Sequence, residues 1–566
     1  MAGRNETQHF GNVPTIGIDR SIFKQEFNHK TSFNMGKLIP FYVDSDIMPG
    51  DTWKLNTTMV IRLLSPAVPI MDNLYLDIYY FFIPHRLTWE HFPEYLGENK
   101  NGVWTQTTEY EIPHLITPAG GYDQNAIATY MGAVPQGANS AGETFRRDAI
   151  NAYCLTWNEW FRDQNVVPPV TINIKDGDVT GNNNDATLGG TVLPVYKFHD
   201  YFTSALPAPQ KGNAITMPLG TTAPVSVYGN GNTLGLMSLV DGTSDQLTYR
   251  GLISGRTIPE QDRGGLLTTA WMESPVKVGT ILEEAPIAEK VSVGVSKDPA
   301  YSGIVGTADL TQAVAASVNA LRLAIATQRI LEKDARGGTR YREIIKNHFN
   351  TTIADGRVQI PEYLGGKQIP INITQVLQTS ATNEVSPQGN PGAFSLTSDT
   401  SESISKSFDE WGTLLGVMCI RQDHTYQQGR ARMWARRRRL DMYWPALANL
   451  GEQPIYASEL KVEPNGANDK VVFGYQEAWA EYRYKNNRIS GELSSLYTPS
   501  LDIWHLGDLY TDTPILSNEF LQETDKYLNR SILVKNHHQF LADIEVSGTS
   551  VRPMPIYSIP GLIDHM

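Results

Sequence analysis

The sequence predicts a mainly β protein whose core is an antiparallel β-sandwich of the Greek-key or jelly-roll type, with long insertions between its strands. Segments with strand character lie near both ends of the 566-residue chain, so segments far apart in the sequence are expected to pair in one sheet. Segments that favour helix are few. Long stretches rich in Gly, Asn, Thr, Ser and Pro separate the regular segments.

The first strands follow a segment that we interpret as an arm. Residues 1–40 mix scattered Arg and Lys with Asn, Gly and Phe and show no sustained period, so we expect an N-terminal arm before a single domain over residues 41–566. Asn73–Pro84, rich in Tyr, Phe and Ile, predicts a strand with two apolar faces. Thr52–Leu64 predicts a half-buried strand, because its apolar residues share one parity: Trp53, Leu55, Met59, Ile61 and Leu63.

Three further strands are predicted late in the chain, at Val471–Tyr484, Leu501–Leu506 and Asn529–Val534. Two segments favour helix. The longer is Asp309–Arg336, which starts with an N-cap residue, carries apolar residues at helical spacing and is followed by Gly-Gly. The shorter is Arg147–Asp163, which is amphipathic.

Long connections are predicted where glycine and small polar residues dominate. By composition, residues 176–190 and residues 381–406 form polar loops. Residues 212–306 consist mostly of short β-like runs broken by glycines. Connections of this length within a compact domain are usually functional surfaces.

Composition limits the kind of protein. The mean hydropathy of −0.30 indicates a soluble globular chain, and the longest apolar runs are too short to cross a membrane. The start of the chain has no apolar core, so no secretion signal is expected. The two cysteines, Cys154 and Cys419, exclude a disulfide scaffold and suggest buried thiols in a protein that folds in a reducing cytosol.

The strongest local feature is a basic run. Arginine can bind phosphate in a bidentate way, and the interleaved Trp434, Tyr443 and Trp444 could stack on unpaired bases, so this run is a candidate contact for single-stranded nucleic acid. The alternatives are an ion-pair cluster between subunits or a solvated face, and the sequence does not decide among them. The run contains Arg430, Arg432, Arg436, Arg437, Arg438 and Arg439.

No catalytic, metal or cofactor motif emerges. Asp176–Gly181 resembles the start of a calcium-binding EF-hand loop, but its fifth and twelfth positions are Thr180 and Thr187, where that loop needs stronger oxygen ligands. Gly229–Gly235 has the wrong glycine spacing for a dinucleotide loop. We therefore expect no catalytic residues, no bound metal and no cofactor.

Several motifs, in order along the chain, carry a family likeness. They are Tyr79–Leu87 (YYFFIPHRL), Trp157–Asn165 (WNEWFRDQN), Asp200–Pro207 (DYFTSALP), Asp334–Tyr341 (DARGGTRY), Pro361–Gly366 (PEYLGG), His424–Gly429 (HTYQQG) and Arg552–Leu562 (RPMPIYSIPGL). The chain from about residue 75 onward resembles the major capsid proteins of gokushoviruses, which are small bacteriophages of the Microviridae with single-stranded DNA. Residues 212 to about 300 match nothing in that family. A variable insertion of the family would look the same.

The resemblance implies a fold and a set of partners. It implies an eight-stranded viral jelly roll that assembles with copies of itself into a T=1 icosahedral shell around a circular single-stranded DNA genome. It also implies assembly in the cytoplasm of a bacterial host, a place in the virion, and three helpers: an internal scaffolding protein, a minor pilot protein and a small basic DNA-binding protein. Residues 212–306 would form a surface protrusion used for attachment to a bacterial receptor.

The net charge of the chain supports the need for a basic DNA-binding protein, because at −13 it would give an acidic coat that repels an acidic genome.

A rival interpretation from a different class of protein is a β-sandwich glycan-binding protein or glycosidase, suggested by 11 Trp and 26 Tyr. No carboxylate pair stands out to support hydrolysis, and this rival leaves the ordered motifs unexplained.

Overall fold

The computed structural model describes residues 20–100, 108–213, 318–379, 388–389, 391–401 and 404–557, and isolated stretches between 215 and 308. The chain divides into two compact units. One comprises Met1–Asn213 and Arg329–Met566, and the other comprises Ala214–Gln328. Most of the expected insertion at residues 212–306, and all of residues 1–19, lie outside the described residues.

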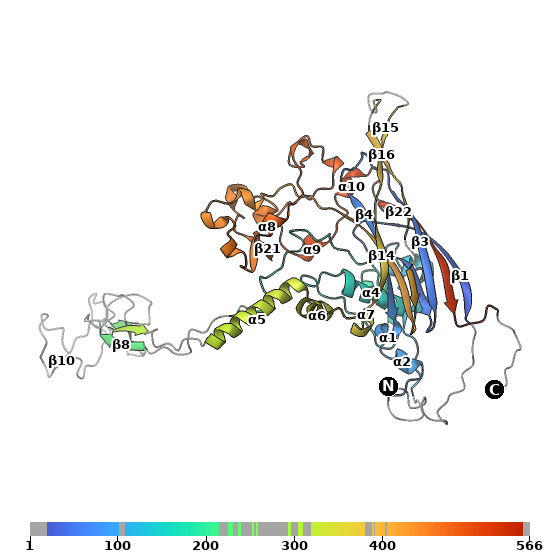
Figure 1. Cartoon of the computed structure of the whole chain (residues 1–566), viewed down its shortest axis with the longest axis horizontal. Helices are drawn as coiled ribbons and strands as arrows, with labels where there is room; N and C mark the ends of the chain where they lie inside the picture. The colour runs from blue at the N-terminus through green and yellow to red at the C-terminus, as the bar shows by residue number, and fades with distance from the viewer. Residues whose placement is uncertain are drawn as a thin grey trace, which may run out of the picture. The chain divides into compact units, whose positions relative to one another are not determined.

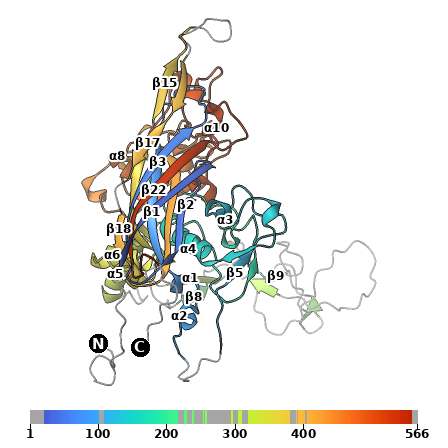
Figure 2. The ribbon, with the colours of Figure 1, turned by 90° about the vertical axis from the view of Figure 1, so that its right-hand side faces the viewer.

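Two antiparallel sheets form the core of the larger unit (Figures 1 and 2). The first has the order β1-β22-β3-β17, with β18 also paired to β3, and the second has the order β14-β4-β19-β2. Because β17 and β18 share one partner strand, they count as a single interrupted strand, and the two sheets together contain eight strands. The strands of the two sheets are β1 (Ser21–Phe33), β2 (Ile39–Ile47), β3 (Thr52–Leu63), β4 (Leu74–Pro84), β14 (Glu362–Pro370), β17 (Thr397–Thr400), β18 (Ile404–Ser407), β19 (Gly412–Gln422) and β22 (Phe540–Arg552).

This strand order confirms the mainly β prediction and the jelly-roll architecture. The first strand pairs with the last, as Ser21 opposite Arg552 shows, and successive strands of the sandwich alternate between the two sheets except for β4 and β14, which pair within one sheet. Burial along β3 alternates as predicted. β4 is buried on both faces, because the sandwich core covers one face and Trp160 and Phe161 pack on Phe81 on the other. The inner faces of both sheets enclose one large apolar core that includes Ile61, Leu414 and Ile544.

Several predicted strands differ in the structure. The strand predicted at 471–484 is shorter: β21 spans Val472–Glu477, after which Trp479 adopts a left-handed backbone conformation with φ of 64°. The strand predicted at 501–506 is wrong, because Asp502–Trp504 is a 3₁₀ helix. The strand predicted at 529–534 is also wrong, because α10 (Leu528–Ser531) is helical there.

Sequence periodicity also failed to indicate several strands. β1 lies within residues 1–40, so pairing in the sheet begins inside the segment expected to be an arm. Residues 381–406, expected to be a polar loop, contain β17, part of β18 and all of β16 (Pro391–Ser395). Their side chains are mostly polar or small, so alternation gives little signal there.

Both helix predictions are confirmed within the described residues. The predicted helix at 147–163 is α4 (Asp148–Thr156), continued by a π-helical turn at Trp157–Phe161. The long one is α5 (Val318–Gly337); residues 309–317 of the prediction lie outside the described residues. The remaining α-helices of the described residues are α1 (His85–Thr88), α2 (Phe92–Tyr95), α3 (Ile127–Tyr130), α6 (Tyr341–Phe349), α7 (Asp355–Val358), α8 (Ala480–Arg483) and α9 (Asn518–Leu521).

No helix in the described part of the chain is long and apolar enough to span a membrane.

Smaller sheets complete the fold. In the smaller unit, β8 pairs with β13, β9 with β12 and β10 with β11. These strands and the rest are β5 (His114–Ile116), β6 (Thr144–Arg146), β7 (Val179–Thr180), β8 (Val225–Gly229), β9 (Leu236–Ser238), β10 (Leu252–Ile253), β11 (Arg256–Thr257), β12 (Val293–Val295), β13 (Ile304–Ala308), β15 (Ile373–Leu377) and β20 (Glu452–Tyr456).

Residues 425–515, here named the C-terminal lobe, are inserted between β19 and β22. A second apolar core joins Tyr426 and Phe473 of this lobe to Phe202 and Phe520 outside it. A buried charged cluster lies where the lobe leaves the sandwich. It consists of Lys197, His424, Asp508 and Glu523. Asp508 binds the Lys197 amine at 2.8 Å and His424 Nδ1 at 3.0 Å, and Glu523 binds His424 Nε2 at 3.1 Å.

Candidate nucleic-acid interface

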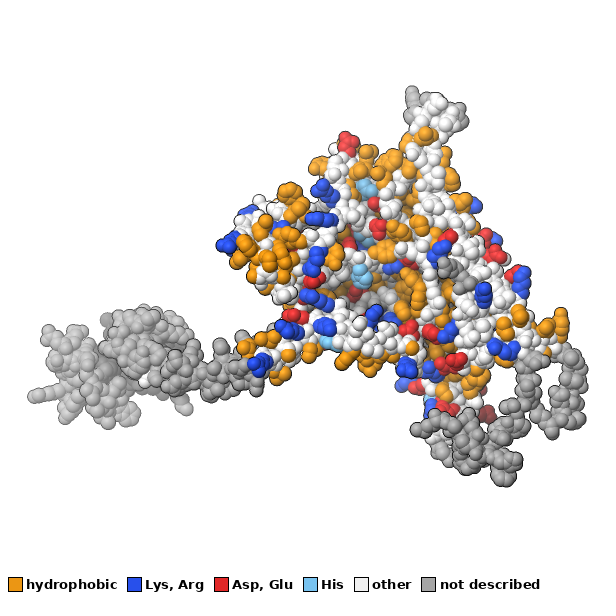
Figure 3. Space-filling model, viewed as in Figure 1, with side chains coloured by type: hydrophobic (Ala, Val, Ile, Leu, Met, Phe, Trp, Pro, Cys, Tyr) orange, Lys and Arg blue, Asp and Glu red, His pale blue; other side chains and the backbone are white. Residues whose placement is uncertain are grey.

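The arginine run lies on the surface of the C-terminal lobe and precedes the β20–β21 hairpin in the chain. Two single-turn 3₁₀ helices carry part of it, at Arg432–Trp434 and Arg439–Asp441, and a third follows at Pro445–Leu447. Several side chains on or beside these turns are exposed, among them Trp434 and Leu440. Figure 3 shows the result on the lobe near α8, where orange apolar side chains and blue basic side chains gather side by side.

Three of the six arginines bind acids of the same lobe. Arg430 pairs with Asp469 at 2.7 Å. Arg432 pairs with Glu459 at 3.1 Å and also donates to the carbonyl of Pro454. These two, with the third arginine described next, attach the run to the β20–β21 hairpin.

Arg436 is the third inward-facing arginine. Its guanidinium lies 3.0 Å from Glu481 and stacks 4.2 Å above the ring of Tyr482. At the neighbouring Arg432, burial opposes the charge, but the carboxylates of Glu459 and Glu481 outweigh that effect and raise the pKa above its ordinary value. Arg432 is therefore a fixed cation, and much of its charge is neutralised inside the lobe.

The other three arginines, Arg437, Arg438 and Arg439, are exposed and form no ion pair with any residue that the structure describes. The backbone N–H groups of Arg437 and Arg438 donate to Asp441 at 2.9 and 2.7 Å, and these bonds lower the pKa of that carboxyl. Arg439 stacks 4.8 Å above the ring of Trp444. The backbone of this segment is thus held in place while its cationic side chains face solvent.

A cleft of about 560 Å³ opens beside the run. Its walls combine aromatic faces with cations and amides, and Trp434 at its rim is 70 % exposed. Sequence reasoning missed the opposite wall, which includes Tyr484, Lys485 and Arg488. The spacing in YRYKNNR (Tyr482–Arg488), aromatic residues interleaved with basic ones, was the available signal.

Phosphates and unpaired bases suit such a surface. Guanidinium groups bind phosphate oxygens, and exposed aromatic rings stack on bases without reading their identity. The segment thus combines free cations, accessible rings and a supported backbone, as sequence-independent binding of a single strand requires.

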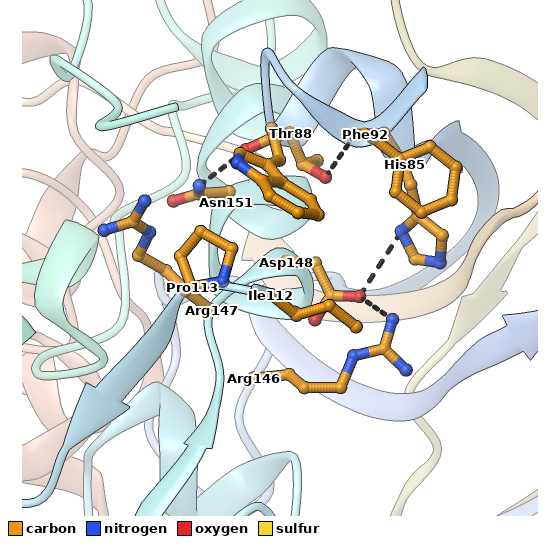
Figure 4. Close-up of a pocket in the computed structure, with 10 residues that line it drawn as sticks. His85, Thr88, Phe92, Ile112, Pro113, Arg146, Arg147, Asp148 and Asn151 are labelled. Carbon is orange, nitrogen blue, oxygen red and sulfur yellow. Dashed lines mark hydrogen bonds and ion pairs between the residues drawn. The ribbon is translucent and has the colours of Figure 1, made fainter. Parts of the chain in front are cut away.

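A second, smaller cavity resembles an active site only superficially (Figure 4). Asp148 faces both His85, at 3.3 Å, and Arg146, at 2.6 Å. Burial lowers the pKa of His85, against the opposing effect of Asp148, and His85 Nε2 is bound to the carbonyl of Ser45 at 2.9 Å. The hydroxyl of Thr88 donates to the carbonyl of His85, so it is not presented as a nucleophile.

The rejected calcium motif has a structural role. Asp176 accepts hydrogen bonds from Trp89 Nε1 at 2.7 Å and from His91 Nδ1 at 2.9 Å, so its oxygens support local packing. Both cysteines are fully buried and free, as predicted. Burial raises the pKa of the Cys419 thiol to about 12, which makes it unreactive at neutral pH.

Comparison with known proteins gives a consistent family assignment. Residues 11–562 match the family model described as capsid protein (F protein). The chain is 38 % identical to capsid protein VP1 of Bdellovibrio phage phiMH2K, covering 99 % of this chain and 98 % of that one. It is 35 % identical to capsid protein VP1 of Chlamydia phage 1, covering 98 % and 97 %. It is 36 % identical to capsid protein VP1 of Spiroplasma virus 4, covering 94 % of each.

These matches cover the sandwich, the lobe and the connections between them, so they concern the whole chain. They set aside the glycan-binding or glycosidase interpretation, because the family and these relatives are structural capsid proteins and not enzymes. Proteins of this family act as many copies that form a shell, and their place is the virion. The chain belongs to the F-protein family of phage capsid proteins.

Proposed function

We propose that this chain assembles, in the cytoplasm of a bacterial host, into a T=1 icosahedral shell that encloses a circular single-stranded DNA genome. The observation that carries this proposal is the similarity to three phage capsid proteins over nearly the full chain, on an eight-stranded sandwich of the jelly-roll type. A jelly roll offers a compact wall two sheets thick, with loops free to meet neighbouring copies.

Within that shell, Arg437, Arg438 and Arg439 contact the packaged DNA on the inner wall, with Trp434 and Trp444 as stacking surfaces. The three arginines are exposed and form no ion pair in the described chain. The nearby Asp441 carboxyl offsets part of the charge of Arg438, so most of their charge is available for phosphate. Arg430, Arg432 and Arg436 hold the segment in position through Asp469, Glu459 and Glu481, and add little free charge.

Three free arginines per copy neutralise little of a genome beside a coat whose chains each carry a net charge of −13. A small basic DNA-binding protein therefore shares this task, and an internal scaffolding protein and a minor pilot protein assist assembly and delivery. The general argument is electrostatic, since each phosphate held near an acidic wall needs a compensating cation.

Replacing Arg437, Arg438 and Arg439 together with Gln tests the DNA contact. The variant should form shells of normal shape that contain less DNA and lose it at lower salt, because phosphate contacts weaken with ionic strength. Packaged DNA is measured as the ratio of nucleic acid to protein in purified particles across a salt series.

Replacing the same three residues with Lys is the matched control, because it keeps the charge and should preserve the DNA content. Unchanged DNA content in the Gln variant would show that this segment is a solvated face. If the Gln variant forms no shell and the Lys variant forms normal shells, the segment is a charged bridge between subunits.

We further propose that residues 212–306 form the surface protrusion that attaches to a bacterial receptor. Contacts within Ala214–Gln328 set this segment apart as a compact unit, which supports a separate role. Replacing residues 212–306 with a short Gly-Ser linker should leave shell assembly intact and abolish binding to host cells. Normal cell binding by such particles would exclude the attachment role.

A further inference from the structure

The β15–β16 hairpin rises from the end of the sandwich (Figures 1 and 2), and within the described chain its two strands pair only with each other. Its base is firmly held: the Ile371 N–H donates to the Leu74 carbonyl at 2.8 Å, and the hydroxyl of the buried Ser395 donates to the Asn372 carbonyl at 2.9 Å. An isolated two-stranded hairpin is marginally stable in water, so cover from another surface would stabilise this one.

The hairpin exposes apolar side chains and is almost free of charge. Val376 and Phe394 are 45 % and 49 % exposed. Their pairing partners are Gly392 and Thr374, which places both side chains on the same face. Between Ile371 and Ser398 the sequence contains one charged residue, Glu384, although 19 % of the whole chain is charged. Depletion of charge combined with exposed apolar side chains is typical of the centre of a protein interface.

A second exposed apolar patch lies at the same end of the molecule. Met71 and Leu533 are each 67 % exposed, and Leu501, whose carbonyl accepts from the Trp504 N–H, is 45 % exposed. Hydrogen bonds join their segments: Met71 N–H to the Trp504 carbonyl at 2.8 Å, and Leu533 N–H to the Ser65 carbonyl at 3.0 Å. Helix α10, just before Leu533, lies near the end of the sandwich from which the hairpin rises in both views (Figures 1 and 2).

We propose that the Val376–Phe394 face of this hairpin docks on the Met71–Leu501–Leu533 patch of a neighbouring copy in the shell. A shell brings equivalent ends of its copies together around each rotation axis, so two different patches at one end can meet head to tail and close a ring. Both surfaces expose apolar side chains, so they match each other in polarity, and the anchored base lowers the entropy lost on docking. The inference rests on shell formation by this family and is independent of the number of copies.

Cross-linking between two kinds of chain tests the contact. Particles are assembled from a mixture of Phe394→Cys chains and Leu533→Cys chains and then oxidised. Because Cys154 and Cys419 are fully buried, the new thiols are the accessible ones. The expected result is a disulfide-linked dimer containing one chain of each kind on a non-reducing gel.

The matched control replaces Leu533→Cys with Ile22→Cys, which is also 67 % exposed but pairs at the far end of β22. That mixture should give no mixed dimer. Particles that assemble normally and form no 394–533 dimer, or form dimers equally in the control, would overturn the proposal.

A charge placed on the same face gives an independent readout. Phe394→Asp should leave the melting temperature of the unassembled chain unchanged and lower the particle yield roughly tenfold or more, as loss of a central interface side chain does. Gln375→Asp puts the same charge on the opposite face and should assemble normally. A wild-type particle yield from Phe394→Asp would contradict the docking. If those particles are normal but not infectious, the hairpin face binds another protein and not a neighbouring copy.

Discussion

At the scale of single residues, the arginines between 430 and 439 perform two different jobs. The basic run and the aromatic residues within it are plain in the sequence, and from them a contact with nucleic acid could be predicted. Which of the arginines remain free could not be predicted, because the acids that pair with Arg432 and Arg436 are Glu459 and Glu481, which are 27 and 45 residues further on. Only the folded β20–β21 hairpin brings those charges together.

Arg432→Gln should destabilise the lobe by about 3 kcal/mol, because it leaves the buried Glu459 carboxylate without its counter-charge. Arg438→Gln is the matched control within the same run, and its cost should stay within about 0.5 kcal/mol, as for most exposed positions. Urea unfolding of the unassembled chains measures both. Equal stabilities of the two variants would show that the inward pair is not structural.

His424 makes the stability of the chain depend on pH. Burial alone would lower its pKa, but the carboxylates of Glu523 and Asp508 outweigh burial and raise the pKa from 6.5 to about 9. The protonated form is therefore favoured by folding. Its stabilising contribution is complete below about pH 6.5 and is lost as the pH rises through 9.

The wild-type chain should accordingly lose on the order of 3 kcal/mol of unfolding free energy between pH 6.5 and pH 9.5 through this residue. His424→Gln cannot carry the charge, so it should be less stable at pH 6.5 and much less sensitive to alkali. Chemical unfolding at several pH values measures this. Parallel pH profiles for the two chains would exclude His424 as the cause.

At the scale of elements, sequence periodicity succeeded where one strand has one buried face or is apolar throughout, as in β3 and β4. It failed at Leu501–Leu506 and Asn529–Val534, where the apolar residues belong to helical turns: Leu528 and Ile532 are both buried and lie four residues apart. β22 was not predicted: Phe540, Ala542 and Ile544 share one parity, but glycine and serine in its second half weaken the pattern.

β22 is central to one sheet, since it pairs with both β1 and β3. Ile544→Ala should therefore cost about 2–5 kcal/mol, by loss of buried surface and creation of a cavity. Its neighbour Glu545 points to the exposed face, and Glu545→Ala should change stability by less than about 0.5 kcal/mol. Thermal unfolding of both variants checks this, and similar melting temperatures would place β22 outside the core.

At the scale of the whole molecule, the resemblance carried by motifs such as HTYQQG predicted the fold and the family, and both are confirmed. One reason such a motif identifies the fold is physical: His424 lies within the buried charged cluster that joins lobe and sandwich. The contacts between copies could not be predicted in this way. They depend on surfaces such as the β15–β16 hairpin, whose exposed apolar face appears only when the strands are in register.

A reconstruction of purified particles by cryo-electron microscopy tests the central claim most directly. The account predicts uniform T=1 shells whose wall is the eight-stranded sandwich, with Arg437, Arg438 and Arg439 on the inner surface against the DNA. Material that remains as free 63.0 kDa chains would contradict it. So would a shell in which these three arginines face outward.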